Sequence, residues 1–321
     1  MVPEKILLIK PSSFGDIIHT LPVIDALKSA WPESSLTWVV NSPYEALVRL
    51  CPLVDDVIPF IRKGASLTDV HVFLRHLRQT RYDLVIDLQC LLRSGLMTTF
   101  SRGTRKMGLQ DGREGSTLFY SEIIRWNETN LHAVDRYLKT VDHLGLKHPT
   151  RVKFPLRIPE GQNFLESHTL KKQEYIVLNP FSRGHSKRWR LGGFAEVIKA
   201  FPGRTFVVVG EKSDATEAQS LAGPSVVDLT GRTTLVELLM VLQNSKLLVT
   251  NDSGPMHLAV ALEVPVVALF SPSSNPALTG PYGHLDQVLT FSADESQAKN
   301  TDTGATPFSQ QVITQVERNT I

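Results

Sequence analysis

The fold of this chain is decided by Lys246-Leu-Leu-Val-Thr-Asn-Asp-Ser-Gly-Pro-Met-His-Leu-Ala-Val-Ala261. The apolar run 247–249 is typical of a buried parallel strand, and the apolar residues after Pro255 recur at helical spacing. The polar turn 251–254 joins the two. A strand, a tight turn and a helix place backbone N–H groups and the positive end of a helix dipole at the carboxyl edge of a sheet. The stretch therefore predicts an α/β fold with an anion site at this turn, where Ser253 adds a hydroxyl and Gly254 permits close approach.

Short apolar runs alternate with amphipathic stretches along the whole chain, which predicts parallel sheets with helical crossovers. In the first half we expect strands over 6–9, 36–40 and 84–87 and helices over 17–30, 43–50, 69–79 and 132–144. In the second half we expect strands over 175–178, 205–209, 247–249 and 264–270 and helices over 192–201, 214–222, 233–243 and 255–262.

A break in this alternation divides the chain into two doubly wound domains that face each other across a cleft. Two prolines and a glycine interrupt the pattern within 153–161, so we expect domains over 1–155 and 156–321. The second domain is expected to end in a polar tail, with a loop over 299–306 and a short amphipathic helix over 308–317.

The composition is that of a soluble globular protein, with 42% hydrophobic residues and 34 Lys and Arg against 32 Asp and Glu. This near balance, without interleaved aromatic residues, argues against nucleic acid. The two cysteines, Cys51 and Cys90, have no metal-ligand spacing and favour a reducing compartment. No apolar run is long enough to span a bilayer, and the first residues lead directly into a strand without a secretory signal. We therefore expect a cytoplasmic protein.

The loop after the first expected strand, Lys10-Pro-Ser-Ser-Phe-Gly-Asp16, is the first candidate site. Gly15 permits a tight turn, and Asp16 begins the helix with its carboxylate toward the cleft. The carboxylate is either a helix cap, worth about 1 kcal/mol, or a general base. A dinucleotide fingerprint is absent, since the turn has one glycine.

A second loop, Asn179-Pro-Phe-Ser-Arg-Gly-His-Ser-Lys-Arg-Trp189, follows a strand of the second half. Its hydroxyls, including Ser182, and its cations, including Lys187, suit a phosphate, although a solvated basic loop has the same composition. It is not a P-loop, and the chain has no nucleophile elbow and no metal-ligand cluster.

Three further residues keep alternative interpretations. Glu211 and Asp214 follow another strand, where an acidic side chain either binds ribose hydroxyls or caps the next helix. His257 lies one turn into the helix of the anion site and is either a ligand contact or a core histidine.

The two loops at 10–22 and 251–259 resemble those of glycosyltransferase family 9, the heptosyltransferases of lipopolysaccharide. Further matching motifs occur in the family's order at 87–94, 113–120, 132–136, 271–273 and 281–283, and the type that transfers the first heptose is the most similar. The resemblance implies the GT-B fold, with an acceptor-binding first domain and a second domain that binds the nucleotide-sugar donor.

The resemblance also implies roles for individual residues. Asp16 matches the catalytic base. The implied donor contacts are Ser182, Lys187, Asp214, Thr233, Asp252, Ser253, Gly254 and His257. The implied acceptor contacts are Ser13, Gly15, Arg62, Lys63 and Arg113.

The resulting expectation is an inverting, metal-independent enzyme that moves heptose from ADP-heptose to an anionic lipid-linked saccharide, with ADP-heptose as co-substrate and no cofactor. Any membrane contact would be peripheral, at the inner face of the inner membrane. Two alternatives stay open: a GT-B transferase that uses a UDP- or GDP-sugar, and a nucleotide-sugar-binding protein without transfer activity. An oxidoreductase is disfavoured by the missing glycine fingerprint.

Overall fold

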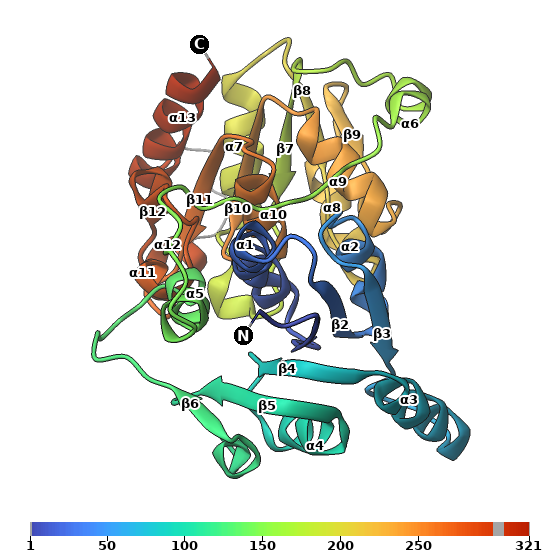
Figure 1. Ribbon diagram of the computed structural model, residues 1–321. Helices are drawn as coiled ribbons and strands as arrows, with labels where there is room; N and C mark the ends of the chain where they lie inside the picture. Colours follow the sequence, from blue (N-terminus) through green and yellow to red (C-terminus); the bar gives the residue numbers. More distant parts are fainter. Residues whose placement is uncertain (1, 298–304, 321) are drawn as a thin grey trace. The chain divides into compact units, whose positions relative to one another are not determined.

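The computed structural model describes residues 2–297 and 305–320. The chain divides into two compact units, Met1–Arg157 and Ile158–Ile321. Each unit has one six-stranded parallel sheet with helices packed against it (Figure 1). The α/β class with two doubly wound domains is therefore confirmed, and the division between the units falls within the predicted segment 153–161.

The first sheet has the strand order β3-β2-β1-β4-β5-β6. The strands are β1 (Lys5–Ile9), β2 (Ser35–Asn41), β3 (Asp56–Phe60), β4 (Arg81–Asp87), β5 (Arg102–Leu109) and β6 (Glu122–Ile124). The helices of this unit are α1 (Phe14–Ala30), η1 (Ser42–Tyr44), α2 (Glu45–Arg49), α3 (Leu67–Gln79), α4 (Leu92–Phe100), η2 (Ser116–Phe119) and α5 (Ala133–His143).

The second sheet has the order β12-β11-β10-β7-β8-β9. The strands are β7 (Tyr175–Asn179), β8 (Thr205–Val208), β9 (Val226–Asp228), β10 (Leu247–Asn251), β11 (Val266–Phe270) and β12 (Val288–Thr290). The helices are α6 (Gln162–Ser167), η3 (His185–Lys187), α7 (Leu191–Ala200), η4 (Lys212–Asp214), α8 (Ala215–Ala218), η5 (Gln219–Leu221), α9 (Leu235–Gln243), α10 (Gly254–Ala261), α11 (Pro276–Thr279), η6 (Leu285–Gln287), α12 (Ala293–Gln297) and α13 (Pro307–Thr320).

Both sheets have the same topology when the strands of each unit are counted from its own first strand. The order is then 3-2-1-4-5-6, which is that of doubly wound nucleotide-binding folds. In the first sheet the chain proceeds from β1 toward one edge and from β4 toward the other, so the strand order reverses between β1 and β4. The same reversal occurs between β7 and β10 in the second sheet. Ligands bind at such switch points, beyond the carboxyl ends of the strands, and all the predicted loops of the two sites follow these ends.

The predicted strands are those with continuous apolar sequence, because a central parallel strand is covered on both faces. All residues of β7 and β10 are buried. The strands that the sequence did not reveal lack this pattern. β5 contains the charged residues Arg102, Arg105 and Lys106. β3 is the edge strand of its sheet and contains Pro59, a residue that edge strands tolerate. The strands β6, β9 and β12 have only three residues each.

The helix expected over 308–317 is α13, and it belongs to the core of the second unit instead of a polar tail. Phe308, Val312 and Val316 are buried in the same cluster as the strand residues of β7 and β10. The Phe308 ring lies 5.5 Å from the Trp189 ring and 6.0 Å from the Phe291 ring. The loop expected over 299–306 lies outside the described residues, except for 305 and 306.

Because Phe308 fills the space between these two rings, Phe308→Ala should lower the free energy of unfolding of the second unit by about 3–5 kcal/mol. The control is Leu285→Ala at an exposed position of the same unit, where the change should stay within about 0.5 kcal/mol. Urea unfolding measures both variants, and an equal effect of the two substitutions would contradict the place of α13 in the core.

Candidate functional site

In the first unit, the loop between β1 and α1 holds the Asp16 carboxylate in a network of hydrogen bonds. Oδ2 accepts from the backbone N–H of Ser13 at 3.0 Å and from its Oγ at 2.6 Å. Oδ1 accepts from the hydroxyl of Tyr137 at 2.7 Å. The Lys10 ammonium lies 3.9 Å from Oδ1. The N-cap of α1 is therefore Ser13 and not Asp16, which lies at the third helical position and completes the capping box. Asp16 still exposes 31% of its side chain at the switch point.

The charge of Asp16 is stabilised by its neighbours. Burial raises the pKa of this carboxyl, but the Lys10 ammonium and the hydrogen bonds from Ser13 and Tyr137 outweigh burial and hold the pKa well below its usual range. Burial raises the pKa of Tyr137, so its hydroxyl remains a donor to the carboxylate. Burial also lowers the pKa of Lys10. The arrangement is a carboxylate fixed in one orientation and ionised at neutral pH.

Packing of helix α5 against helix α1 supplies the tyrosine of this network. Arg136 donates to the Tyr137 hydroxyl at 3.1 Å and to Asp111 at 2.7 Å, so the hydroxyl has both a donor and an acceptor. The Lys10 Nζ lies 4.9 Å from the centre of the Tyr137 ring and donates to the carbonyl of Leu88 at 3.1 Å. Sequence reasoning missed Lys10 and Tyr137 as site residues, although both stand within or next to the motifs quoted above.

The three basic residues predicted for the acceptor follow strand ends at the same edge of the sheet. Arg62 and Lys63 are exposed after β3, and Arg113 is exposed after β5. Neighbouring strands lie about 4.8 Å apart, so these strand ends flank the end of β1 at about 10 Å on either side. The edge therefore presents one central carboxylate between two groups of cations, which suits an acceptor with anionic groups. Gly15 lies in the first turn of α1, next to Asp16.

In the second unit, the predicted turn lies between β10 and α10. Ser253 is the N-cap of α10, and it and Gly254 are partly exposed. The Asn179 amide donates to the Ser253 hydroxyl at 2.6 Å and to Thr250 at 2.9 Å, which ties the ends of β7 and β10 together. The first N–H groups of a helix have no partner within it, so they are available to an anion. His257 is buried on α10, as a core histidine would be.

The Asp252 carboxylate pairs with the Lys187 ammonium, which comes from the loop after β7. Ser274 donates to the same carboxylate oxygen at 2.8 Å, and Ser182 donates to the Asp252 carbonyl at 2.9 Å. Asp252 is buried, whereas the Lys187 side chain is 40% exposed. The carboxylate therefore positions the lysine instead of facing the solvent itself, and the exposed ammonium is the group that an anion can reach. Ser274 was not singled out from the sequence.

The two acidic candidates after β8 have different surroundings. Asp214 is buried, and its oxygens accept from Arg188 at 3.1 Å and from the backbone N–H of Glu211 at 3.0 Å. Both carboxylate oxygens of Asp214 therefore already accept hydrogen bonds from the protein itself. The side chain of Glu211 is 72% exposed, with Arg183 at 3.9 Å. Thr233 lies in the turn after β9, at the same sheet edge and partly exposed.

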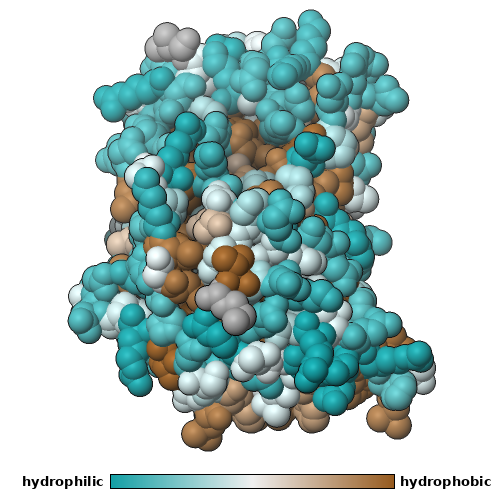
Figure 2. Space-filling model, in the orientation of Figure 1, coloured by the Kyte–Doolittle hydropathy of each residue, from teal (hydrophilic) through white to brown (hydrophobic). Residues whose placement is uncertain are grey.

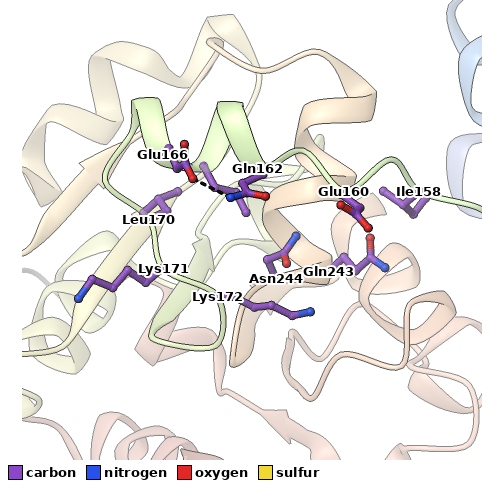
Figure 3. A pocket seen from close by; sticks show the side chains of 10 residues that line it. Ile158, Glu160, Gln162, Glu166, Leu170, Lys171, Lys172, Gln243 and Asn244 are labelled. Carbon is purple, nitrogen blue, oxygen red and sulfur yellow. Dashed lines mark hydrogen bonds between the residues drawn. The ribbon is translucent and has the colours of Figure 1, made fainter.

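A pocket of about 660 Å³ in the second unit lies apart from these groups (Figure 3). Its lining includes Lys171 and Lys172, which precede β7, and Asn244, which precedes β10. It is thus at the amino ends of the strands, opposite the predicted site. Within α6, which forms part of its wall, the Gln162 amide donates to the Glu166 carboxylate at 2.9 Å. Within the described ranges, no group of three or more His, Cys, Asp or Glu side chains is placed to hold a metal ion. Both cysteines are buried free thiols.

Comparison with known proteins gives consistent similarities. Residues 70–306 match the family described as glycosyltransferase family 9 (heptosyltransferase). Lipopolysaccharide heptosyltransferase 1 of Pseudomonas aeruginosa is 30% identical over 300 residues, which cover 87% of this chain and 81% of that protein. The structure of E. coli heptosyltransferase WaaC with ADP is 27% identical, with a TM-score of 0.81 over 98% of this chain and 99% of that one. A family 9 glycosyltransferase from Veillonella parvula shares the fold, with a TM-score of 0.84.

The environment of Asp16 predicts a pH-dependent contribution to stability. Because its folded-state pKa lies below the unfolded value of about 3.9, the contribution is present above that pH and is lost as the pH falls toward the folded-state pKa. Asp16→Asn should lower the free energy of unfolding at pH 7 by roughly 1–2 kcal/mol. Denaturant unfolding as a function of pH should show this difference shrinking below about pH 4. A difference that is constant with pH would contradict the network.

Proposed function

Because the chain belongs to glycosyltransferase family 9, we propose that it transfers heptose from ADP-heptose to an anionic, lipid-linked saccharide in the cytoplasm. That it is a heptosyltransferase of the lipopolysaccharide core follows from its family and relatives. The nucleotide of the donor, the inverting course and the residue roles are the proposal. The observation that carries the proposal is the pair of switch-point sites, with a fixed carboxylate in one unit and an exposed lysine beside a helix N-terminus in the other.

The donor diphosphate is assigned to the turn at the end of β10. The N–H groups of Ser253 and Gly254 and the Lys187 ammonium stabilise the negative charge that develops on the diphosphate as it leaves. These groups make a metal ion unnecessary, so activity should persist in the presence of a chelator. ADP is favoured over other nucleotides because a similar heptosyltransferase has been solved with ADP.

The ribose of the donor is assigned to Glu211. Its carboxylate is exposed at the end of β8, whereas Asp214 already accepts from Arg188 and from a backbone N–H. Asp214 then supports the ribose site by holding the Glu211 loop. This assignment departs from the donor contact at Asp214 that the resemblance implies, and it gives the two acids their roles by exposure.

The reaction is assigned an inverting course with Asp16 as the general base. The acceptor hydroxyl attacks the anomeric carbon from the face opposite the diphosphate, and the C–O bond to the diphosphate breaks as the new bond forms. Asp16 takes the hydroxyl proton. The hydrogen bonds that it accepts from Ser13 and Tyr137 hold its carboxylate in one orientation. Lys10 lowers the basicity of Asp16, and anionic groups of the acceptor bound at Arg62, Lys63 and Arg113 oppose that effect.

The donor assignment is tested by calorimetric titration with ADP, UDP, GDP and NAD. We expect selective binding of ADP, and we expect Lys187→Ala to weaken it by roughly 10- to 100-fold, the range for a hydrogen bond to a charged group. Lys172→Ala, in the pocket at the other end of the strands, is the control and should bind ADP unchanged. Preference for UDP or GDP would show that the donor carries that nucleotide instead of ADP. Equal ADP affinity of the native chain and the Lys187 variant would show that this lysine does not contact the phosphates.

The catalytic assignment is tested with Asp16→Ala, which should lower kcat by roughly 10²–10⁴ and leave ADP binding nearly intact. The control is Asp69→Ala. Asp69 caps α3 through the same bonds to Ser66, at 2.6 Å and 2.8 Å, but it has no partner equivalent to Tyr137 among these bonds. Loss of a cap alone then costs stability without a comparable fall in kcat. Equal effects of both substitutions would reduce Asp16 to a structural cap.

A further inference from the structure

The loop between β7 and α7, residues 180–190, lies between two other loops of the second unit. β7 pairs with β10 on one side and with β8 on the other, so the turn after β10 and the loop after β8 flank this β7–α7 loop. The turn carries the proposed phosphate contacts Ser253 and Gly254, and the loop after β8 carries the proposed ribose contact Glu211. The β7–α7 loop therefore joins the two halves of the proposed nucleotide site.

On the phosphate side, the buried residue Asn251 at the end of β10 holds both ends of the β7–α7 loop. Its side-chain oxygen accepts from the backbone N–H of Trp189 at 3.0 Å, and its amide donates to the carbonyl of Pro180 at 2.7 Å. The neighbouring Asp252 pairs with Lys187 of the same loop. These contacts place Lys187 beside the phosphate turn without help from the loop after β8.

On the ribose side, the guanidinium of Arg188 makes the corresponding connection. Its Nε donates to the carbonyl of Ser182 at 2.7 Å, its Nη2 donates to Asp214 at 3.1 Å, and its Nη1 lies 3.3 Å from Glu217. The second oxygen of Asp214 accepts from the backbone N–H of Glu211 at 3.0 Å. One arginine thus connects the backbone of the β7–α7 loop to the backbone of the loop after β8 through a single carboxylate.

The two loops are in direct contact at this point. A Cβ at Gly210 would lie 2.5 Å from the ring of Phe181, and the Arg188 guanidinium lies 5.6 Å from the centre of that ring. Arg183 and Glu211 also link the loops at 3.9 Å, but both side chains are more than 70% exposed, at 76% and 72%, and such pairs contribute little. The Arg188 side chain is only 17% exposed, so its contacts fix the spacing of the loops.

Polar contacts are the main means by which the second unit can bind a nucleotide. Its described part exposes one large apolar side chain, that of Leu285, and Figure 2 shows mainly hydrophilic residues in the upper part of the view, where Figure 1 draws α6, α7 and α13. Hydrogen bonds weaken steeply when their geometry is disturbed. The spacing of the phosphate and ribose contacts therefore determines whether one ligand can use both.

We propose that Arg188 is a positioning residue that sets the spacing between the diphosphate and ribose contacts of the donor, an inference that rests on the proposed function. A nucleoside diphosphate reaches both loops with one molecule, and its second contact forms readily only if the spacing of the loops matches the ligand. The Nε, Nη1 and Nη2 atoms of Arg188 all have protein partners, so the residue acts through the loops and not by touching the nucleotide.

Arginine is suited to this role because its planar guanidinium presents several donors in a rigid fork. A lysine at the same position keeps the positive charge, but its ammonium is a single point charge that cannot hold the Ser182 carbonyl and the Asp214 carboxylate in one fixed geometry. Arg188→Lys therefore changes the spacing of the loops without changing the net charge of the site, which separates positioning from general electrostatic attraction of phosphate.

The experiment is calorimetric titration with three ligands: ADP, ADP that lacks both ribose hydroxyls (dideoxy-ADP) and inorganic pyrophosphate. We expect the native chain to prefer ADP over dideoxy-ADP by roughly 10- to 100-fold, the range for hydrogen bonds to a charged group. In Arg188→Lys this preference should fall by at least about threefold, because position 188 and the ribose hydroxyls are coupled although they do not touch. Pyrophosphate should bind unchanged, because Asn251 and Asp252 still place Lys187.

The matched control is Arg190→Lys. Arg190 belongs to the same loop and is buried, but it donates to Glu196 of α7 at 2.8 Å and to Ser309 of α13 at 3.2 Å, and not to the loop after β8. This variant should keep the full preference for ADP over dideoxy-ADP. Circular dichroism shows whether each variant is folded. If Arg188→Lys does not fold, Arg188→Gln, which keeps one amide donor, provides the same comparison.

The outcomes separate this inference from the donor proposal. ADP binding by the native chain with an unchanged preference in Arg188→Lys would overturn the role of Arg188 and leave the donor proposal standing. A parallel loss of pyrophosphate binding, or an equal change in Arg190→Lys, would overturn that role as well. Absence of ADP binding by the native chain, or equal binding of ADP and dideoxy-ADP, would contradict the donor or ribose assignment and this inference with it.

Discussion

The parallel pairing of β1 with β4 and of β7 with β10 is the constraint on which the rest of the structure depends. At each pair the crossovers turn away in opposite directions, so the loops beyond the strand ends separate and leave room for a ligand. Every group assigned to donor or acceptor follows a strand end of one of the two sheets. The topology of the two sheets therefore determines where the assigned groups lie, whichever side chains the loops carry.

At each switch point, contacts between residues far apart in sequence prepare a charged group. Tyr137 and Lys10 fix Asp16 in the first unit, and Asp252 fixes Lys187 in the second. Asp16 lies in the first turn of α1 and its partner Tyr137 lies on α5, whereas Lys187 lies in η3 and its partner Asp252 lies in the turn after β10. A group held in this way loses little conformational freedom when the substrate binds, which is how a preorganised site stabilises a transition state.

The first unit combines this site with a surface of different character. Eight of the ten large apolar side chains that the described residues expose lie between residues 61 and 118, and that stretch has ten Lys and Arg against five Asp and Glu. The described part of the second unit exposes one large apolar side chain, that of Leu285. Charge and exposed apolar surface are therefore distributed unequally between the two units.

The sequence by itself determined the two-domain α/β fold, the central strands and the loops of both sites, because continuous apolar runs and Gly-containing turns are local signals. It did not reveal β5, whose charged residues hide the strand, or the packing of α13 into the core. Only the tertiary structure decided which side chain of each loop is available. The pairing of Asp16 with Tyr137 joins residues 121 apart in sequence, and the pairing of Asp214 with Arg188 leaves Glu211 as the exposed acid. Such choices depend on how helices pack across a sheet, and no local pattern encodes that packing.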